Sequence, residues 1–137
     1  MNRFRYMLDT NSISHLVRQH PHVARRVVNV PMASLCMSAI TAGELLYGLA
    51  RRSDAVRLHA AVAELMRRVD VLQWDLPAAE RYGILRTDLD RAGRPLGSLD
   101  LLIAAHALAA GAVLVTNDRA FSQVPQLHVE DWTVDLQ

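Results

Sequence analysis

Lysine is absent from this chain, and all fifteen of its basic residues are arginine. The absence excludes any chemistry that needs a lysine side chain. Two interpretations of the arginine content remain open. One is a GC-rich genome, which also favours alanine, and the other is phosphate binding, because a guanidinium group can hold two phosphate oxygens at once. Composition alone does not decide between them.

Cysteine is nearly absent as well. The single Cys36 excludes an internal disulfide, and its place in an apolar run favours a reducing, cytoplasmic location. The first residues contain no apolar stretch of signal-peptide length, so we expect no secretion signal. The longest apolar run, residues 99–116, is interrupted by Asp100, His106 and Gly111. It therefore predicts a helix followed by a strand, and we expect no membrane span.

The 137 residues suit a single domain, and a hydrophobic content of 51% is enough to bury a core. The chain has no repeat, linker or low-complexity tract, so we expect one domain over residues 1–137. Short apolar segments alternate with amphipathic ones, which predicts an α/β fold with a short parallel sheet covered by helices on both faces. The expected strands are residues 4–8, 34–38, 69–74, 112–116 and 127–129, and the expected helices are 11–19, 21–29, 41–52, 54–69, 77–92, 98–110 and 118–122.

Four acidic residues occupy equivalent places in this pattern. Asp9 follows the expected strand 4–8, and Asp118 follows the expected strand that ends at Thr116. Glu44 and Asp100 lie in the first turns of expected helices. In parallel sheets, ligands bind beyond the carboxyl ends of the strands. We therefore expect at least three of the four carboxylates to gather at one edge of the sheet.

Each acid also has a purely structural interpretation at the start of a helix. These are an N-cap for Asp9 and for Asp118, a capping box of Thr41 with Glu44, and a favourable interaction of Asp100 with the helix dipole behind a Ser98 cap. The group as a whole is harder to explain in this way. Asp100 is the only charged residue between Ser98 and Asn117, and carboxylates are rarely buried without a partner.

A bound metal ion would explain the four acids together. Carboxylates at one edge repel one another and raise each other's pKa, and a divalent cation removes that conflict. Oxygen ligands favour Mg²⁺ or Mn²⁺, and no cysteine and histidine cluster has the spacing of a zinc site. Such an ion serves phosphoryl chemistry by lowering the pKa of a bound water. Outside the four acids, fifteen arginines face ten acidic residues, and this balance of +5 suits a polyanionic substrate.

Four segments resemble the PIN-domain nucleases and, among them, the VapC-type toxins. Together they span nearly the whole chain in the order typical of that family. Each segment is weak by itself, but all four at this spacing are specific. The segments are residues 7–12 (MLDTNS), 38–48 (SAITAGELLYG), 99–107 (LDLLIAAHA) and 114–121 (LVTNDRAF).

The resemblance implies a Rossmann-like sheet, a Mg²⁺- or Mn²⁺-dependent endoribonuclease, a homodimer, and a cognate antitoxin that blocks the site and takes the pair to operator DNA. Some members have an extra residue and a glutamate in the last motif, whereas the segment around Asp118 is shorter here. The resemblance implies that Asp9 and Asp100 are the principal metal ligands, that Glu44 is a further ligand, directly or through water, and that Asp118 is the fourth acid. It also implies that Thr116 orients water or an acid, with Asn11 as a secondary candidate for that role.

Two other α/β classes place acidic residues after a first strand, and the sequence fits neither. A receiver domain needs an acidic pair after the first strand and a lysine, and this chain has neither. A haloacid-dehalogenase-like phosphatase needs Asp-x-Asp-x-Thr, but positions 11 and 13 are Asn11 and Ile13. The remaining alternative is a catalytically silent PIN-fold interaction module. Such a module would be expected to lose acids, and all four are present.

Several further residues carry expectations. Arg51 and Arg52 end the helix of Glu44, and Arg94 shortly precedes Asp100, so we expect these arginines to contact an RNA backbone, with solvated helix faces as the alternative. An antitoxin segment is expected to cross helices between residues 20 and 70 and to place an arginine or lysine among the acids. The remaining expectations are that the six histidines form no metal site, that His106 is packed, and that Trp74 and Trp132 are packing residues.

Overall fold

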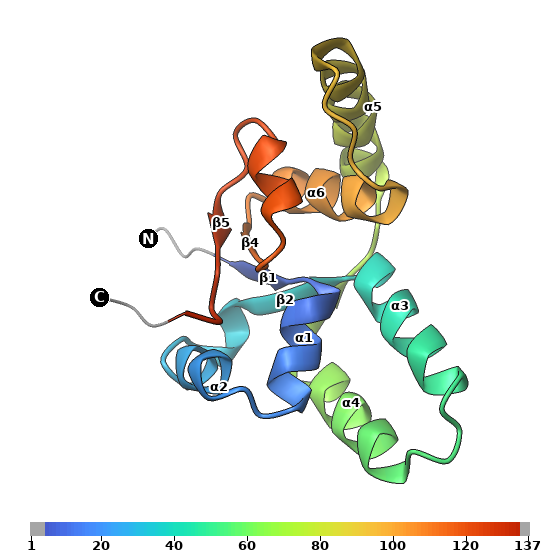
Figure 1. Ribbon diagram of the computed structural model, residues 1–137, viewed down its shortest axis with the longest axis vertical. Helices are drawn as coiled ribbons and strands as arrows, with labels where there is room; N and C mark the ends of the chain where they lie inside the picture. The colour runs from blue at the N-terminus through green and yellow to red at the C-terminus, as the bar shows by residue number, and fades with distance from the viewer. Residues whose placement is uncertain (1–4, 135–137) are drawn as a thin grey trace.

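A parallel sheet of five strands forms the centre of the computed structural model, which describes residues 5–134 (Figure 1). The strand order β3-β2-β1-β4-β5 places β1 in the middle, where Met7 lies opposite Cys36 of β2 and Leu114 of β4. The α/β prediction is confirmed, although residue 4 of the first expected strand lies outside the described residues. The strands are β1 (Tyr6–Leu8), β2 (Leu35–Ser38), β3 (Asp70–Leu72), β4 (Val113–Val115) and β5 (Val129–Glu130).

Helices cover both faces of this sheet, as the sequence predicts. In Figure 1, α5 and α6 lie above the sheet and the first four helices lie below it. Within residues 5–134 the helices are α1 (Thr10–Val17), α2 (Pro21–Val28), α3 (Ala39–Ala50), α4 (Val56–Arg68), α5 (Leu76–Ala92) and α6 (Ser98–Ala110), and the 3₁₀ turns are η1 (Met32–Ser34) and η2 (Arg119–Gln123). None of the described helices is long and apolar enough to cross a membrane.

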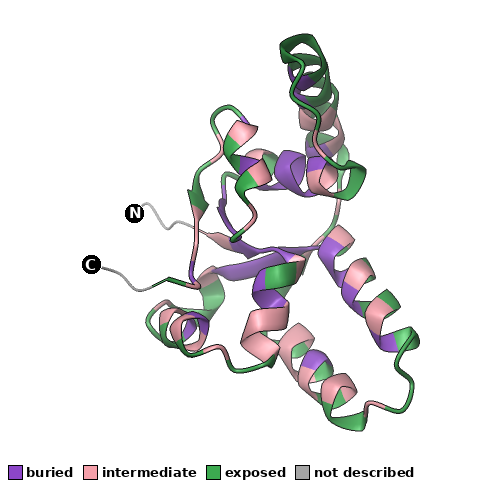
Figure 2. Cartoon of the chain, in the orientation of Figure 1, coloured by how far each residue is buried: buried purple, intermediate pink, exposed green. Residues whose placement is uncertain are grey.

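Alternation along the strands divides the interior into two apolar cores. Successive strand side chains point to opposite faces, so Met7 packs with the core of α5 and α6 while Leu8 packs with the core of α1 to α4. Leu114 and Val115 of β4 divide in the same way. Figure 2 shows the inner strands β1, β2 and β4 largely buried and the outer end of α5 exposed. Helices on both faces therefore hold the sheet in place through these two cores.

The N-terminal caps of two helices differ from those that the sequence suggested. The expected capping box of Thr41 with Glu44 is wrong, because α3 already starts at Ala39 and its N-cap is Ser38, whose hydroxyl accepts a hydrogen bond from the Ile40 N–H. Thr41 is fully buried inside the first turn. The expected Ser98 cap is also wrong, since the N-cap of α6 is Gly97, which has no side chain to offer.

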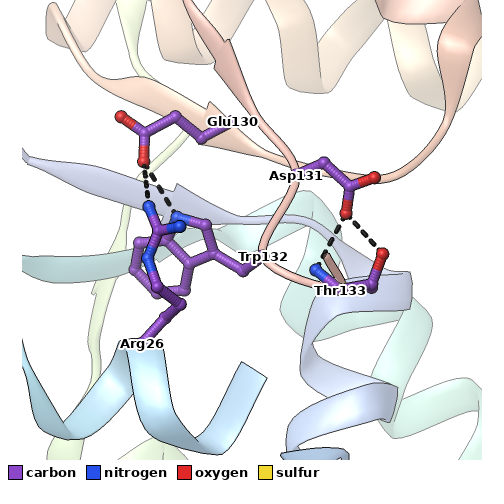
Figure 3. A network of polar contacts seen from close by, with 5 residues as sticks. All are labelled: Arg26, Glu130, Asp131, Trp132 and Thr133. Atoms are coloured by element: carbon purple, nitrogen blue, oxygen red, sulfur yellow. Dashed lines mark hydrogen bonds and ion pairs between the residues drawn. The ribbon is translucent and has the colours of Figure 1, made fainter. Parts of the chain in front are cut away.

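The C-terminal end of the described chain is held against α2 by a polar network (Figure 3). Glu130 Oε1 accepts hydrogen bonds from Arg26 Nη2 and from the Trp132 indole Nε1, each at 2.9 Å. The Arg26 guanidinium also lies 5.2 Å from the centre of the Trp132 ring, and Tyr6 packs on the ring at 5.3 Å. Trp132 is buried, as expected for a packing residue. Trp74 is half-buried and donates its indole N–H to the Leu102 carbonyl.

Candidate active site

Asp9 stands at the carboxyl end of the central strand β1. It is the N-cap of α1, and its Oδ1 accepts the Ser12 N–H at 2.8 Å, so the predicted capping role is confirmed. Burial raises the pKa of the Asp9 carboxyl, and the nearby charge of Asp118 acts in the same direction. Hydrogen bonds from Thr116 and Ser12 partly offset this rise. Asp9 is therefore a fixed carboxylate whose negative charge is incompletely balanced.

Thr116 joins two of the acids, and it is buried directly after β4. Its side chain hydrogen-bonds the Asp9 carboxylate, and its Oγ1 accepts the Asp118 N–H at 3.0 Å. Asp118 in turn caps the 3₁₀ turn η2 by accepting the Ala120 N–H, as expected. The geometry thus matches the expectation that Thr116 orients an acid, and it fixes the end of β4 beside the end of β1.

Glu44 approaches the same edge from α3. Its Oε1 accepts a hydrogen bond of 2.6 Å from the hydroxyl of Thr10, the first residue of α1. Thr10 is not among the site residues predicted from the sequence, and neither is Ser12, whose hydroxyl donates to the Val115 carbonyl at 2.7 Å. The signal available was a pair of hydroxyl residues, one and three positions after Asp9. Such residues are common at helix starts, and the partner of Thr10 lies 34 residues away.

Asp100 connects the four acids electrostatically. It lies half-buried in the first turn of α6, and burial is the largest cause that raises the pKa of its carboxyl. The negative charges of Asp118, Glu44 and Asp9 raise this pKa further, in that order. Coupling of this kind requires the carboxylates to be close to one another. The structure therefore brings all four predicted acids to the carboxyl edge of the sheet.

The chemistry of these donors fits a hard cation, but they are not a preformed cage. Carboxylate and hydroxyl oxygens are the ligands that Mg²⁺ and Mn²⁺ prefer, and the raised pKa values of Asp9 and Asp100 reflect negative charge that a cation would balance. Within residues 5–134, however, no three acidic, histidine or cysteine side chains stand close enough to hold one ion. Binding would therefore require the carboxylates to draw closer together.

The candidate RNA-binding arginines lie at different distances from the acids. Arg52 lines a groove of about 240 Å³ together with Glu44. Arg51 is the C-cap of α3, and its guanidinium lies 5.5 Å from the centre of the Tyr47 ring. Arg94 is exposed just beyond the end of α5. The contact of these arginines with RNA stays a prediction, as does any role for the exposed Asn11.

A more voluminous cavity, of about 850 Å³, lies elsewhere. It is at the amino ends of the strands, beside Tyr6 of β1 and Asp70 of β3. None of the four acids lines it. We place the site at the carboxylates nevertheless, because coupled acids indicate chemistry, whereas the volume of an open cavity does not.

Three histidines form a ring cluster that their sequence spacing did not indicate. The ring centres of His15 and His20 are 5.3 Å apart, and those of His20 and His22 are 5.7 Å apart. The turn between α1 and α2 brings them together, with Gln19 in a left-handed conformation at φ 61°. His20 is the N-cap of α2. The contacts are therefore explained by the way two short helices are joined.

Comparison with known proteins identifies the family of this chain. The family model described as "PIN domain" matches residues 6–127. The protein "tRNA(fMet)-specific endonuclease VapC" of Shigella flexneri is 37% identical over 94% of this chain and 98% of its own length.

Two solved complexes have the same fold. In "Crystal structure of DNA bound VapBC from Salmonella typhimurium", the matching chain is 37% identical, with a TM-score of 0.87 over 95% of this chain and 99% of that one. VapBC-1 from nontypeable Haemophilus influenzae gives 36% identity and a TM-score of 0.85, over 96% of this chain and 100% of that chain. With its sheet order, its acidic edge and these matches, the chain belongs to the PIN-domain family and, within it, to the VapC ribonucleases.

Proposed function

We propose that this protein is a metal-dependent endoribonuclease that hydrolyses RNA phosphodiester bonds, slows growth, and is neutralised by a cognate antitoxin. The observation that carries the proposal is the coupling of Asp100 to Asp118, Glu44 and Asp9 at the carboxyl edge of the sheet. In a family of ribonucleases, such a group of acids is the expected place for a catalytic cation. Cleavage of cellular RNA puts the reaction in the cytoplasm.

The acids would hold Mg²⁺ or Mn²⁺, with Asp9 and Asp100 as principal ligands and Glu44 and Asp118 completing the set. When bound, the ion would lower the pKa of a water and balance charge on the phosphate. The Ser12 N–H and the Thr116 hydroxyl hold the Asp9 carboxylate in one orientation. The Thr10 hydroxyl does the same for Glu44. These hydrogen bonds reduce the reorganisation that the acids need before reaction.

A transfer RNA is the substrate class that we propose. It is supported by the names of relatives at 37% identity from Shigella flexneri and Salmonella typhimurium, both called "tRNA(fMet)-specific endonuclease VapC". Arg51, Arg52 and Arg94 would contact the phosphates of the folded RNA, which supplies affinity without reading sequence. A homodimer would extend this surface along the RNA and favour recognition of its shape.

The groove between α1, α3 and α4 suits the antitoxin. Its apolar lining includes Leu45, Leu49, Leu58 and Val62, and its polar lining residues are Thr10, Ser14, Arg18, Glu44 and Arg52. An apolar antitoxin segment bound here could place an arginine or lysine among Asp9, Glu44 and Asp100 and compete with the cation. Of the helices that line the groove, α3 and α4 lie in the expected region between residues 20 and 70, whereas α1 precedes that region. Relatives solved as VapBC complexes, one of them bound to DNA, support an antitoxin that also binds operator DNA.

The direct test is cleavage by the purified protein. Incubation with total transfer RNA and Mg²⁺ should yield discrete fragments, and sequencing of their ends should locate the cut. Excess EDTA and the Asp100→Asn variant should each abolish the fragments. Undiminished cleavage in EDTA would contradict the metal mechanism, and cleavage of other RNAs but not transfer RNA would contradict the substrate class.

The alternative, a catalytically silent interaction module, makes a different prediction for the same protein. Mn²⁺ that binds the folded state raises its melting temperature by mass action, whereas a module without a site shows no such change. Thermal unfolding with and without Mn²⁺ therefore separates the two functions without any RNA.

A further inference from the structure

A buried polar pair lies behind the acidic edge of the sheet. Ser38 is the last residue of β2 and is fully buried, and His106 lies in the middle of α6 with 3% of its surface exposed. Their side chains are 2.8 Å apart, from Nδ1 of the histidine to Oγ of the serine. Burying an imidazole and a hydroxyl is costly unless both are hydrogen-bonded. An apolar side chain would fill the same place among its alanine neighbours at lower cost.

The hydrogen bonds of this pair have one consistent direction. Burial lowers the pKa of His106, so its ring is neutral and has one donor and one acceptor nitrogen. The ring also hydrogen-bonds the backbone of Gln73, and because this bond raises the pKa of His106, its partner is the carbonyl oxygen. A carbonyl accepts only, so Nε2 carries the proton and Nδ1 accepts from the Ser38 hydroxyl. Ser38 Oγ in turn accepts the Ile40 N–H at 3.1 Å, which completes a chain from Ile40 through Ser38 and His106 to Gln73.

This chain of hydrogen bonds connects the two helices that carry Glu44 and Asp100. Ile40 lies in the first turn of α3, one helical turn before Glu44, and His106 belongs to α6, which begins near Asp100. The chain of bonds ends at Gln73, in the loop between β3 and α5. This loop has a second bond to α6, because the Trp74 indole N–H donates to the Leu102 carbonyl at 3.1 Å. The start of α3 is thus tied to α6 and to an anchored loop.

We propose that His106 is a positioning residue, which holds the start of α3 against α6 through Ser38 and thereby sets how far Glu44 stands from Asp100. The inference rests on the proposed function, since the two acids matter to each other only if they share a cation. The hydroxyl of Ser38, which caps α3, is oriented by its bond to His106 of α6, the helix that carries Asp100. Loss of this bond would let the first turn of α3 shift, and Glu44 would shift with it.

Two isosteric substitutions separate the two bonds of the ring. In His106→Asn, the amide oxygen can replace Nδ1 as the acceptor from Ser38. In His106→Gln, the amide nitrogen can replace Nε2 as the donor to Gln73, and the bond to Ser38 is lost. We expect His106→Gln to weaken Mn²⁺ binding about tenfold, the lower end of the effect of outer-shell partners, and His106→Asn to stay within about twofold of the wild type.

The measurements need no catalysis. Mn²⁺ affinity is measured on the full chain by electron paramagnetic resonance, and ¹⁵N NMR of the histidine rings checks that Nδ1 of His106 carries no proton. Ser38→Ala also removes the cap of α3 and should weaken Mn²⁺ binding at least as much as His106→Gln. The double variant should lose no more than Ser38→Ala alone, because that variant already lacks the bond to His106. His20→Ala is the matched control, since it removes the cap of α2 but leaves the bonds of Ser38 and His106 in place, and it should leave Mn²⁺ affinity unchanged.

The outcomes separate this inference from the proposed function. Equal Mn²⁺ affinity in the wild type and in His106→Gln overturns the positioning role while leaving the nuclease intact. Equal losses in His106→Asn and His106→Gln also overturn it, because they would indicate packing of the ring. A wild type that binds no Mn²⁺ overturns the proposed function and with it any need to position Glu44.

Discussion

Among single residues, Asp100 combines a functional role with a cost to stability. Its carboxyl pKa is raised by burial and by Asp118, Glu44 and Asp9, so the folded state disfavours the charged form. The resulting destabilisation is absent at low pH, appears as the pH rises through the ordinary pKa of aspartate, and is complete above the raised pKa.

Asp100→Asn should accordingly raise the melting temperature of the metal-free protein at pH 7 by about 1–3 °C. The same variant should lose the stabilisation by Mn²⁺ and the cleavage of RNA. Thermal unfolding with and without Mn²⁺ measures both effects, and the gain should shrink as the pH is lowered. A less stable variant that still responds to Mn²⁺ would contradict the electrostatic account of this site.

Thr10 provides a second test at the residue scale. Its hydroxyl holds Glu44 Oε1 at 2.6 Å, and Thr10→Val removes that hydroxyl with little change in shape. We expect about tenfold slower RNA cleavage, as for other residues that orient metal ligands. Thr10→Ser keeps the hydroxyl and should retain most of the activity. Full activity in the valine variant would show that Glu44 needs no such support.

At the scale of elements, the end of α3 should contribute to RNA affinity. Arg51 and Arg52 are exposed where that helix stops. Replacing both by alanine should weaken RNA binding and reduce the slope of log affinity against log salt by roughly two phosphate contacts. Titrations at several salt concentrations measure the slope. An unchanged slope would assign these arginines to a solvated helix face, and the cut position should stay the same in either case.

The polar network of Arg26, Glu130 and Trp132, called the clasp below, joins α2 to the C-terminal end of the described chain and should contribute to stability. Glu130→Gln removes the charge that binds Arg26 but keeps an acceptor for the Trp132 indole. Because this ion pair is partly buried, we expect a loss of about 1 kcal/mol in unfolding free energy after allowing for solvent screening. Glu64→Gln is the control, since its pairs with Arg67 and Arg68 are exposed and should contribute nothing measurable. Equal effects in urea unfolding would argue against the clasp.

At the scale of the whole molecule, an active nuclease should harm the cell that makes it. Induced expression of the wild type alone should slow growth, and co-expression of a neighbouring antitoxin gene should restore it. The Asp100→Asn variant should be harmless without the antitoxin. Growth curves with matched protein levels provide the measurement. Normal growth with abundant folded wild-type protein would favour the silent interaction module.

The order and type of the elements follow from the sequence because their signals are local. The apolar run and its bounding glycines predict a helix over residues 98–110, and α6 has these bounds. The acids at strand ends and helix starts predict a common edge, because parallel strands end on the same side of a sheet. Asp9, Glu44, Asp100 and Asp118 meet there. The family resemblance rests on the same residues.

Strand lengths, helix starts and side-chain partners were decided only by the tertiary structure. The strand expected over residues 112–116 pairs over Val113–Val115, because β1 beside it offers three residues. Ser38, and not Thr41, caps α3. The bonds of Thr10 to Glu44 and of Ser38 to His106 join residues 34 and 68 positions apart. Propensity and hydrophobic period act over neighbouring residues, whereas a buried hydroxyl takes whichever partner the packed chain brings within hydrogen-bonding distance.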